Sequence, residues 1–244
     1  MTAPEPPRPR SVSYDALVDD LVGLNWRALK TLWWSVTQPK AYSRAAWHDD
    51  WQNRYTPSFR VWFTLVAILF FFQFFWAADD SALIALFASQ IERSGALLSE
   101  GVTSLDASRF FARVNFSILP IVSALCLFLL GCLWRAWGEP VPIVVRIRYV
   151  FAVVIPSTAL TLPFFWFLGN AQAESALFYV IVSWLIPPPI DAMMAGRGPL
   201  ASLRGLARWW RAVALSGGIL AAMYASALIS MFLSVQYIHW RFPP

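Results

Sequence analysis

The chain has 244 residues, of which 58% are hydrophobic and only 14% are charged, and its formal net charge is +5. A soluble domain usually carries about a quarter charged residues, so this composition excludes an ordinary soluble domain. The basic residues flank long apolar runs instead of forming a domain of their own. This pattern excludes nucleic acid as a partner and indicates contact with membrane lipids, including anionic ones.

The amino-terminal part of the chain precedes any apolar run long enough to cross a membrane. Residues 1–12 are rich in proline and lack an apolar core, so we expect a disordered cytoplasmic tail and no cleavable signal peptide. Residues 13–55 are predicted to form two amphipathic helices, over 13–36 and 41–55. Tryptophans are expected to anchor these helices at the cytoplasmic membrane surface, and a helix pair that docks a partner protein is the alternative. The anchors are Trp26, Trp33, Trp34, Trp47 and Trp51.

Five apolar segments follow and predict a five-helix transmembrane domain over residues 56–244, hence an all-α polytopic membrane protein. The expected spans are 57–78, 115–134, 149–168, 171–186 and 212–237. A short amphipathic helix is expected over 81–91, in the outer connection between the first two spans. The fourth span ends at three consecutive prolines and is short for a hydrocarbon core of roughly 30 Å. It must therefore extend past the prolines or lie tilted as a broken helix.

The fifth span carries the most specific packing signal in the sequence. Small residues recur at every fourth position, which places them on one helix face and lets the backbone of another helix approach closely. These residues are Ala214, Gly218, Ala222, Ser226 and Ser230. Their spacing does not distinguish a helix of the same chain from a helix of another protein.

The distribution of basic residues predicts the orientation. Fifteen lysines and arginines lie on the side that holds the amino terminus, and four lie on the other side. Cytoplasmic connections carry the excess of positive charge. We therefore expect a protein of the bacterial inner (cytoplasmic) membrane, with its amino terminus in the cytoplasm and its carboxyl terminus in the periplasm.

No spacing of residues points to catalysis, to a cofactor or to a metal, so we expect no enzyme. Ionisable residues inside a membrane usually mark function. Here Asp79, Glu174 and Asp191 are expected at the ends of spans, which argues against a transporter with buried carboxylates. His48 and His239 are expected near opposite membrane faces, where they cannot share a metal ion.

Two prolines interrupt the third span beside several hydroxyl side chains. Interrupted helices with free carbonyl groups form transport sites in some membrane proteins, whereas hydroxyls beside prolines also serve to satisfy the loosened backbone. A site for a small or lipidic solute would use Pro156, Ser157, Thr158, Thr161 and Pro163.

The approach to the first span carries a recognisable pattern. It consists of Leu29-Lys30-Thr31-Leu32 through Pro39, then Arg54-Tyr55-x-Pro57-x-x-Arg60. This pattern resembles that of an uncharacterised bacterial family of small multi-pass proteins, which implies only an inner-membrane location. The five-pass plan with a long first outer loop also looks like the Yip family and its bacterial relatives. That resemblance implies a scaffold that engages other membrane proteins, and it assigns no functional residue.

These features favour a non-enzymatic protein that acts by association. It would be an accessory or scaffold subunit of a larger membrane complex, or a homo-oligomer. The motives are the absence of charge within the spans, the small-residue face of the fifth span and the tryptophan-rich amino-terminal helices. The alternative is a permease or channel-like protein for a small or lipidic solute, built around the third and fourth spans.

Overall fold

The computed structural model describes residues 26–48, 55–76, 82–94, 102–169 and 173–241. Every regular element within these ranges is an α-helix. Three helices are long and apolar enough to cross a membrane, namely α7 (Ser104–Leu133), α8 (Ile143–Gly169) and α11 (Gly205–Arg241). The expected all-helical membrane protein is confirmed at this level.

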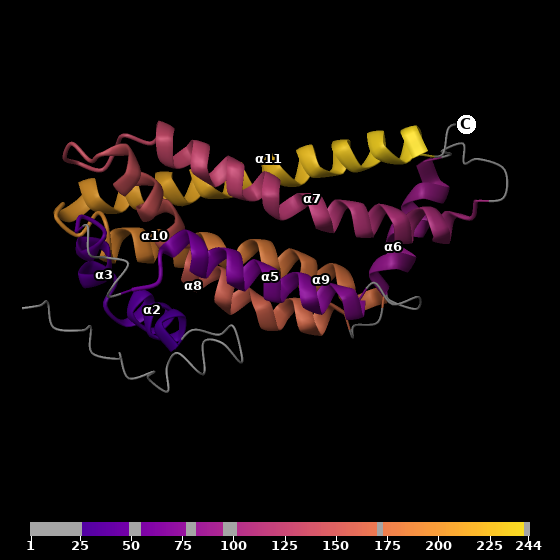
Figure 1. The fold of residues 1–244 in the computed structure, drawn as a ribbon, viewed down its shortest axis with the longest axis horizontal. Helices are drawn as coiled ribbons and strands as arrows, with labels where there is room; N and C mark the ends of the chain where they lie inside the picture. Colours follow the sequence, from indigo (N-terminus) through magenta and orange to yellow (C-terminus); the bar gives the residue numbers. More distant parts are fainter. Residues whose placement is uncertain (1–25, 49–54, 77–81, 95–101, 170–172, 242–244) are drawn as a thin grey trace, which may run out of the picture.

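Two further helical segments run beside these three helices (Figure 1). The first is α5 (Ser58–Trp76), and the second is α9 (Ala173–Leu185) continued by α10 (Pro187–Arg197). The chain thus runs along the bundle five times in alternating directions. Five complete membrane crossings stay a prediction.

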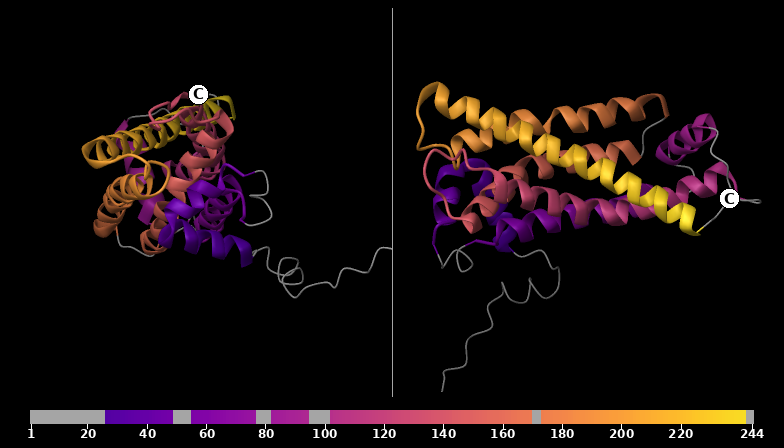
Figure 2. Two further views of the ribbon diagram at one scale, coloured as in Figure 1. Left: turned by 90° about the vertical axis from the view of Figure 1, so that its left-hand side faces the viewer. Right: turned by 90° about the horizontal axis from the view of Figure 1, so that it is seen from above.

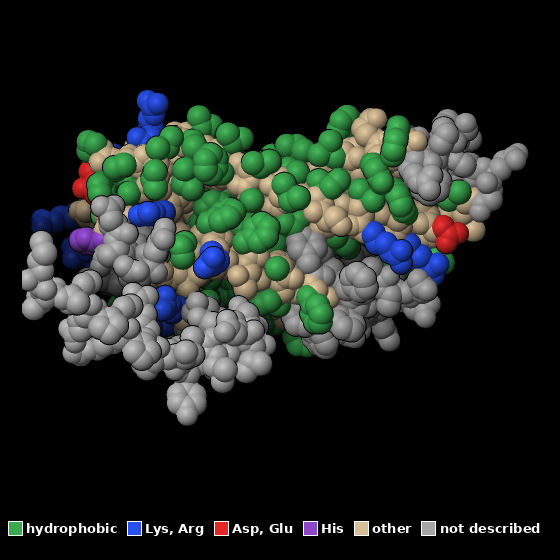
Figure 3. All heavy atoms as spheres, in the orientation of Figure 1, with side chains coloured by type: hydrophobic (Ala, Val, Ile, Leu, Met, Phe, Trp, Pro, Cys, Tyr) green, Lys and Arg blue, Asp and Glu red, His purple; other side chains and the backbone are tan. Residues whose placement is uncertain are grey.

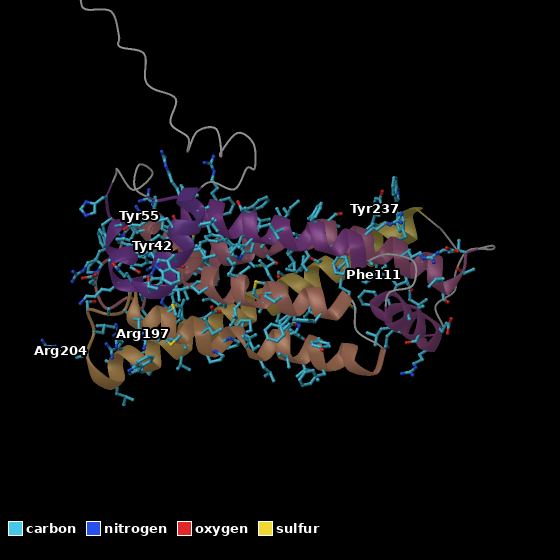
Figure 4. The ribbon with its side chains drawn as sticks, turned by 90° about the horizontal axis from the view of Figure 1, so that it is seen from below. Tyr42, Tyr55, Phe111, Arg197, Arg204 and Tyr237 are labelled. Atoms are coloured by element: carbon cyan, nitrogen blue, oxygen red, sulfur yellow. The ribbon has the colours of Figure 1, made fainter. Side chains whose placement is uncertain are left out.

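Three short helices lie at the two ends of the bundle (Figures 1 and 2). The helices α2 (Trp26–Thr37) and α3 (Pro39–Ala45) lie at one end, and α6 (Ala82–Ser94) lies at the other, near the last residues of α11. We call the first the basic end, because Arg197 and Arg204 lie there beside the amino-terminal helices (Figure 4). This is the end that the charge distribution predicts to be cytoplasmic.

The fourth segment extends past its three prolines. Ile186 has helical backbone angles (φ −70°, ψ −43°), and its N–H donates to the carbonyl of Val182 at 3.1 Å. The three prolines then form the first turn of α10, where a missing N–H is tolerated. Because proline cannot donate, the carbonyls of residues 183–185 receive no hydrogen bond from residues 187–189. The segment therefore reaches the basic end but contains a weakened turn.

The small-residue face of α11 packs against α7 of the same chain. Ser226 and Ser230 are fully buried, and the hydroxyls of Ser226 and Ser123 form a hydrogen bond of 2.9 Å between the two helices. A Cβ atom on Gly218 would lie 3.3 Å from Leu130 Cδ1. Ala214 and Ala222 are half-buried on the same helix. At Gly218 and Ser226 the neighbouring helix is therefore α7 of the same chain.

The helix α2 meets the bundle through a face that mixes small polar and apolar residues. Thr31 and Ser35 are buried, and Leu32 and Trp34 pack against the core. Leu29 and Val36 are exposed, and Trp33 is 67% exposed. The polar atoms are satisfied inside, because the Thr31 hydroxyl donates to the carbonyl of Arg27 and accepts the N–H of Thr56. The outward apolar face is the one that suits contact with a membrane surface.

The second amphipathic helix is shorter than expected and begins earlier. Proline fits the first turn of a helix, so α3 starts at Pro39, and it ends at Ala45 instead of continuing toward residue 55. Trp47 follows the helix, and its indole N–H donates to the Tyr149 hydroxyl of α8. Trp34 packs edge-on against Tyr55, with ring centroids 5.7 Å apart.

Several predictions for the amino-terminal part fall outside the described residues. These are the tail 1–12, the helix before residue 26, the side chain of Trp26 and Trp51.

The helices α7 and α8 begin before the predicted spans. The start of α7 at Ser104 is fixed by Thr103, whose hydroxyl accepts the backbone N–H of Asp106 at 3.1 Å. An oxygen acceptor before the helix and an acidic residue in its first turn both stabilise a helix start. The spans were predicted from long apolar runs, and these first turns were left out because they contain charged residues.

The helices α7 and α8 approach each other closely at Gly131, and this contact is testable. A Cβ atom at Gly131 would lie 2.9 Å from the Ile147 Cα, whereas one at Gly217 on α11 would meet nothing within 4 Å. Gly131→Leu should lower the thermal midpoint of the purified protein, since overpacking costs about 1–3 kcal/mol. Gly217→Leu is the matched control and should leave it unchanged. Equal loss in both variants would contradict the α7–α8 packing.

Candidate functional site

A cavity of about 290 Å³ lies inside the bundle. Each long segment contributes to its wall, with Trp62 from α5, Phe116 from α7, Ser157 from α8, Asp191 from α10 and Met223 from α11. Most of the wall is apolar, and a few polar groups interrupt it. This combination is typical of a small-molecule binding site.

Three of the five residues proposed from the third span lie in this wall. They are Ser157, Thr158 and Thr161 of α8, whose hydroxyls all donate to carbonyls of the same helix at 2.7–3.0 Å. Pro156 is buried outside the wall and Pro163 is exposed. The hydroxyls therefore support the helix around its proline and also give the cavity a polar strip.

Asp191 lies in the same wall, and the sequence did not predict its burial. Its side chain is 2% exposed and lies beside the Ser157 hydroxyl, while its Oδ1 atom has no hydrogen-bond partner. No ion pair between described residues includes it. A buried carboxylate without a charged partner is unfavourable for folding, and such groups in membrane proteins usually serve function.

The sequence placed Asp191 at the end of the fourth span and left open whether that span continues past the prolines. The helix does continue, and Asp191 follows Pro187 by one turn. That turn carries its side chain into the bundle, whereas its depth in the membrane stays a prediction. The signal was present in the sequence, because proline is compatible with the first turn of a helix that continues beyond it.

The cavity reaches the outer surface between α9 and α11. The helix α9 packs against α8 and α6, whereas α11 packs against α10 and α7, so α9 and α11 diverge (Figure 2). Trp184 and Leu220 both line the cavity, and both are 38% exposed. The ring of Trp184 meets Tyr224 edge-on, with centroids 6.2 Å apart. Apolar side chains cover much of the length of the face seen in Figure 3. On α9 and α11, large apolar side chains such as Ile181, Leu185 and Leu228 are exposed as well, so the opening lies among apolar surface residues.

A second hollow, of about 410 Å³, lies at the basic end. Arg135, Arg146 and Arg211 line it together with Glu139. The Arg146 Nε donates to the carbonyl of Val141 at 2.6 Å. The cationic lining fits contact with anionic lipid head groups.

The unpaired carboxylate yields a prediction about stability. Asp191→Asn should leave the thermal midpoint unchanged or raise it, because a neutral amide has no charge to desolvate. Ser226→Val serves as the comparison. It should lower stability by about 1–3 kcal/mol, since it removes the bond to Ser123 and crowds α7. A loss in Asp191→Asn as large as in Ser226→Val would show that the carboxylate holds the bundle together.

No group of three or more His, Cys, Asp or Glu among the described residues could hold a metal ion. His48 is exposed at the basic end, and the side chain of His239 lies outside the described residues.

No family model matches the chain, and neither a curated protein nor a solved structure gives a match. The cavity with Asp191 is the strongest candidate site in the described part of the chain.

Proposed function

We propose that this chain is a non-enzymatic membrane protein that binds a small, mainly apolar solute in its central cavity and gives it passage, as a permease or channel-like protein does. The observation that carries the proposal is the cavity itself, in whose wall Asp191 is buried with one carboxylate oxygen that has no hydrogen-bond partner. Membrane proteins commonly build solute sites where interrupted helices meet inside the bundle.

The size and lining of the cavity indicate the class of solute. A volume of about 290 Å³ is near the lower limit of ligand sites, which run from roughly 300 to 1,000 Å³. Because Trp184 and Leu220 are both cavity wall and outer surface, a solute could enter from the acyl-chain region of the bilayer. Both points favour a small lipophilic molecule.

The weakened turn at the prolines supports passage as well as binding. Helices bend where proline removes a backbone hydrogen bond. The turn is held to α11 by the Ser216 hydroxyl, which donates to the carbonyl of Pro188 at 2.6 Å. Movement of α9 about this turn would widen or narrow the opening beside Trp184.

An accessory or scaffold role is the second candidate, and one observation favours it. The exposed apolar face of α2, formed by Leu29, Trp33 and Val36, is available for association. Two other arguments for a scaffold are weaker. The bundle interior holds a charged group, Asp191, and the small-residue face of α11 contacts α7 of the same chain. A scaffold would co-elute from native membranes with a larger complex at fixed stoichiometry, whereas a permease would elute as a monomer or homo-oligomer.

Photolabelling tests the proposed binding site. Protein in lipid nanodiscs would be irradiated with a neutral short-chain alcohol that carries a diazirine, and the adducts would be mapped by mass spectrometry. Adducts are expected on cavity residues such as Trp62 and Met223. Ala227→Trp should fill the cavity and lower their yield about tenfold, a change of ~1.4 kcal/mol. Ala221→Trp, on an exposed position of the same helix, should leave them unchanged.

Passage needs a separate measurement. Proteoliposomes loaded with radiolabelled butyl glucoside, a neutral amphiphile, should release it faster with the wild-type chain than with Ala227→Trp. Labelling confined to the outer surface of the wild type would overturn the binding site. Labelling without faster release would leave a binding protein and contradict the permease role.

A further inference from the structure

We propose that the preferred solute is an organic monocation, an ammonium group on a small hydrophobic body, with Asp191 as its counter-ion. This inference deepens the proposed function and rests on it. The structure supplies three supporting observations: a carboxylate oxygen without a partner, aromatic side chains in the wall of the same cavity, and a single carboxylate in a mostly apolar wall.

The first observation is the unsatisfied charge. Asp191 is 2% exposed, its Oδ1 atom has no hydrogen-bond partner, and no ion pair between described residues involves it. The arginines of α8 are committed elsewhere, because Arg146 and Arg148 donate to the carbonyls of Val141 and Ala46. A buried carboxylate requires a cation or a proton, and an ammonium ligand would supply both charge and N–H or N–CH₃ contacts.

The second observation is the aromatic lining. Trp62, Phe116 and Trp184 come from three different helices and line the same cavity as Asp191. Aromatic rings attract organic cations, most strongly when the cation is desolvated, and tryptophan is the strongest of them. The aliphatic remainder of the wall suits a hydrocarbon body. Together these groups fit an amine that is charged at one end and apolar at the other.

The third observation separates an organic cation from a metal ion. Hard cations take about six or more oxygen ligands arranged around them. Here the wall supplies one carboxylate, that of Asp191, and otherwise only hydroxyls, from α8, Ser183 and Ser226, in a mostly apolar lining. The α8 hydroxyls donate to carbonyls of their own helix, and Ser226 bonds to Ser123. A single carboxylate in such a wall does not supply the several charged or carbonyl oxygens that a hard cation takes, whereas an ammonium group needs only one counter-charge.

The test compares two molecules of the same shape that differ in charge. Phenyltrimethylammonium and its neutral isostere tert-butylbenzene would compete with the neutral diazirine alcohol for labelling of the cavity. In the wild type the cation should protect at a concentration at least about tenfold lower than the isostere, a difference of ~1.4 kcal/mol. Asp191→Asn should abolish this preference, and Asp191→Glu should retain part of it.

Matched controls make every outcome informative. Glu139→Gln removes a carboxylate at the basic end and should keep the wild-type preference. Retained labelling of Asp191→Asn by the neutral alcohol would show that the variant is folded. If the wild-type cavity is labelled but both molecules protect it at the same concentration, this inference is overturned and the proposed function stands. Absence of cavity labelling in the folded wild type would overturn both.

A second measurement does not depend on any substitution. A phenyltrimethylammonium ion that carries a diazirine on its ring would be irradiated with the wild-type protein in nanodiscs. Its carbene should insert into residues of the cavity wall, including the α10 peptide that holds Asp191. Adducts only on the exposed acidic residue Glu139 or on the outer surface would contradict the assignment.

Discussion

Hydrogen bonding of the backbone inside a bilayer limits where a helix can be interrupted, since unsatisfied carbonyls are costly there. The fourth segment meets this constraint in an unusual way, because it continues helically through Pro187, Pro188 and Pro189. The prolines remove three donors from one turn, and the Ser216 hydroxyl, which donates to the Pro188 carbonyl, ties this turn to α11. The same turn brings Asp191 beside Ser157 and leaves α9 free to diverge from α11. The position of the carboxylate, the cavity and its opening all depend on this continuity.

The remaining helices hold that turn in place by close packing. Gly131 allows the backbone of α8 to approach α7 closely, and the Ser123–Ser226 hydrogen bond joins α7 to α11. Small residues let backbones approach, and dispersion then stabilises the contact without help from the hydrophobic effect. At the basic end, Arg148 bonds to Ala46 and fastens the segment after α3 to α8. The bundle is therefore tightly packed around a cavity that it does not fill.

The sequence predicted the helical membrane class, the small-residue face and the hydroxyl strip of α8, because each follows from a local pattern of residue type and spacing. It did not predict the burial of Asp191, which depends on whether three prolines end a helix or begin a turn of it. For α2 it located an outward apolar face, with Trp33, but not the buried polar residues Thr31 and Ser35. Apolar periodicity does not identify small polar side chains that are satisfied by local hydrogen bonds within a packed face.

Selective chemical modification tests whether the Asp191 carboxylate is buried in a cavity that opens to the apolar phase of the membrane. The protein in its membrane would be treated with dicyclohexylcarbodiimide, which reaches carboxyls from lipid, or with a water-soluble carbodiimide, and the adducts would be located by mass spectrometry. We expect the hydrophobic reagent to modify Asp191, and the water-soluble reagent to modify the exposed Glu139 but not Asp191. Modification of Asp191 by the water-soluble reagent would place it at a membrane edge, and its resistance to both reagents would mean that no solute reaches it.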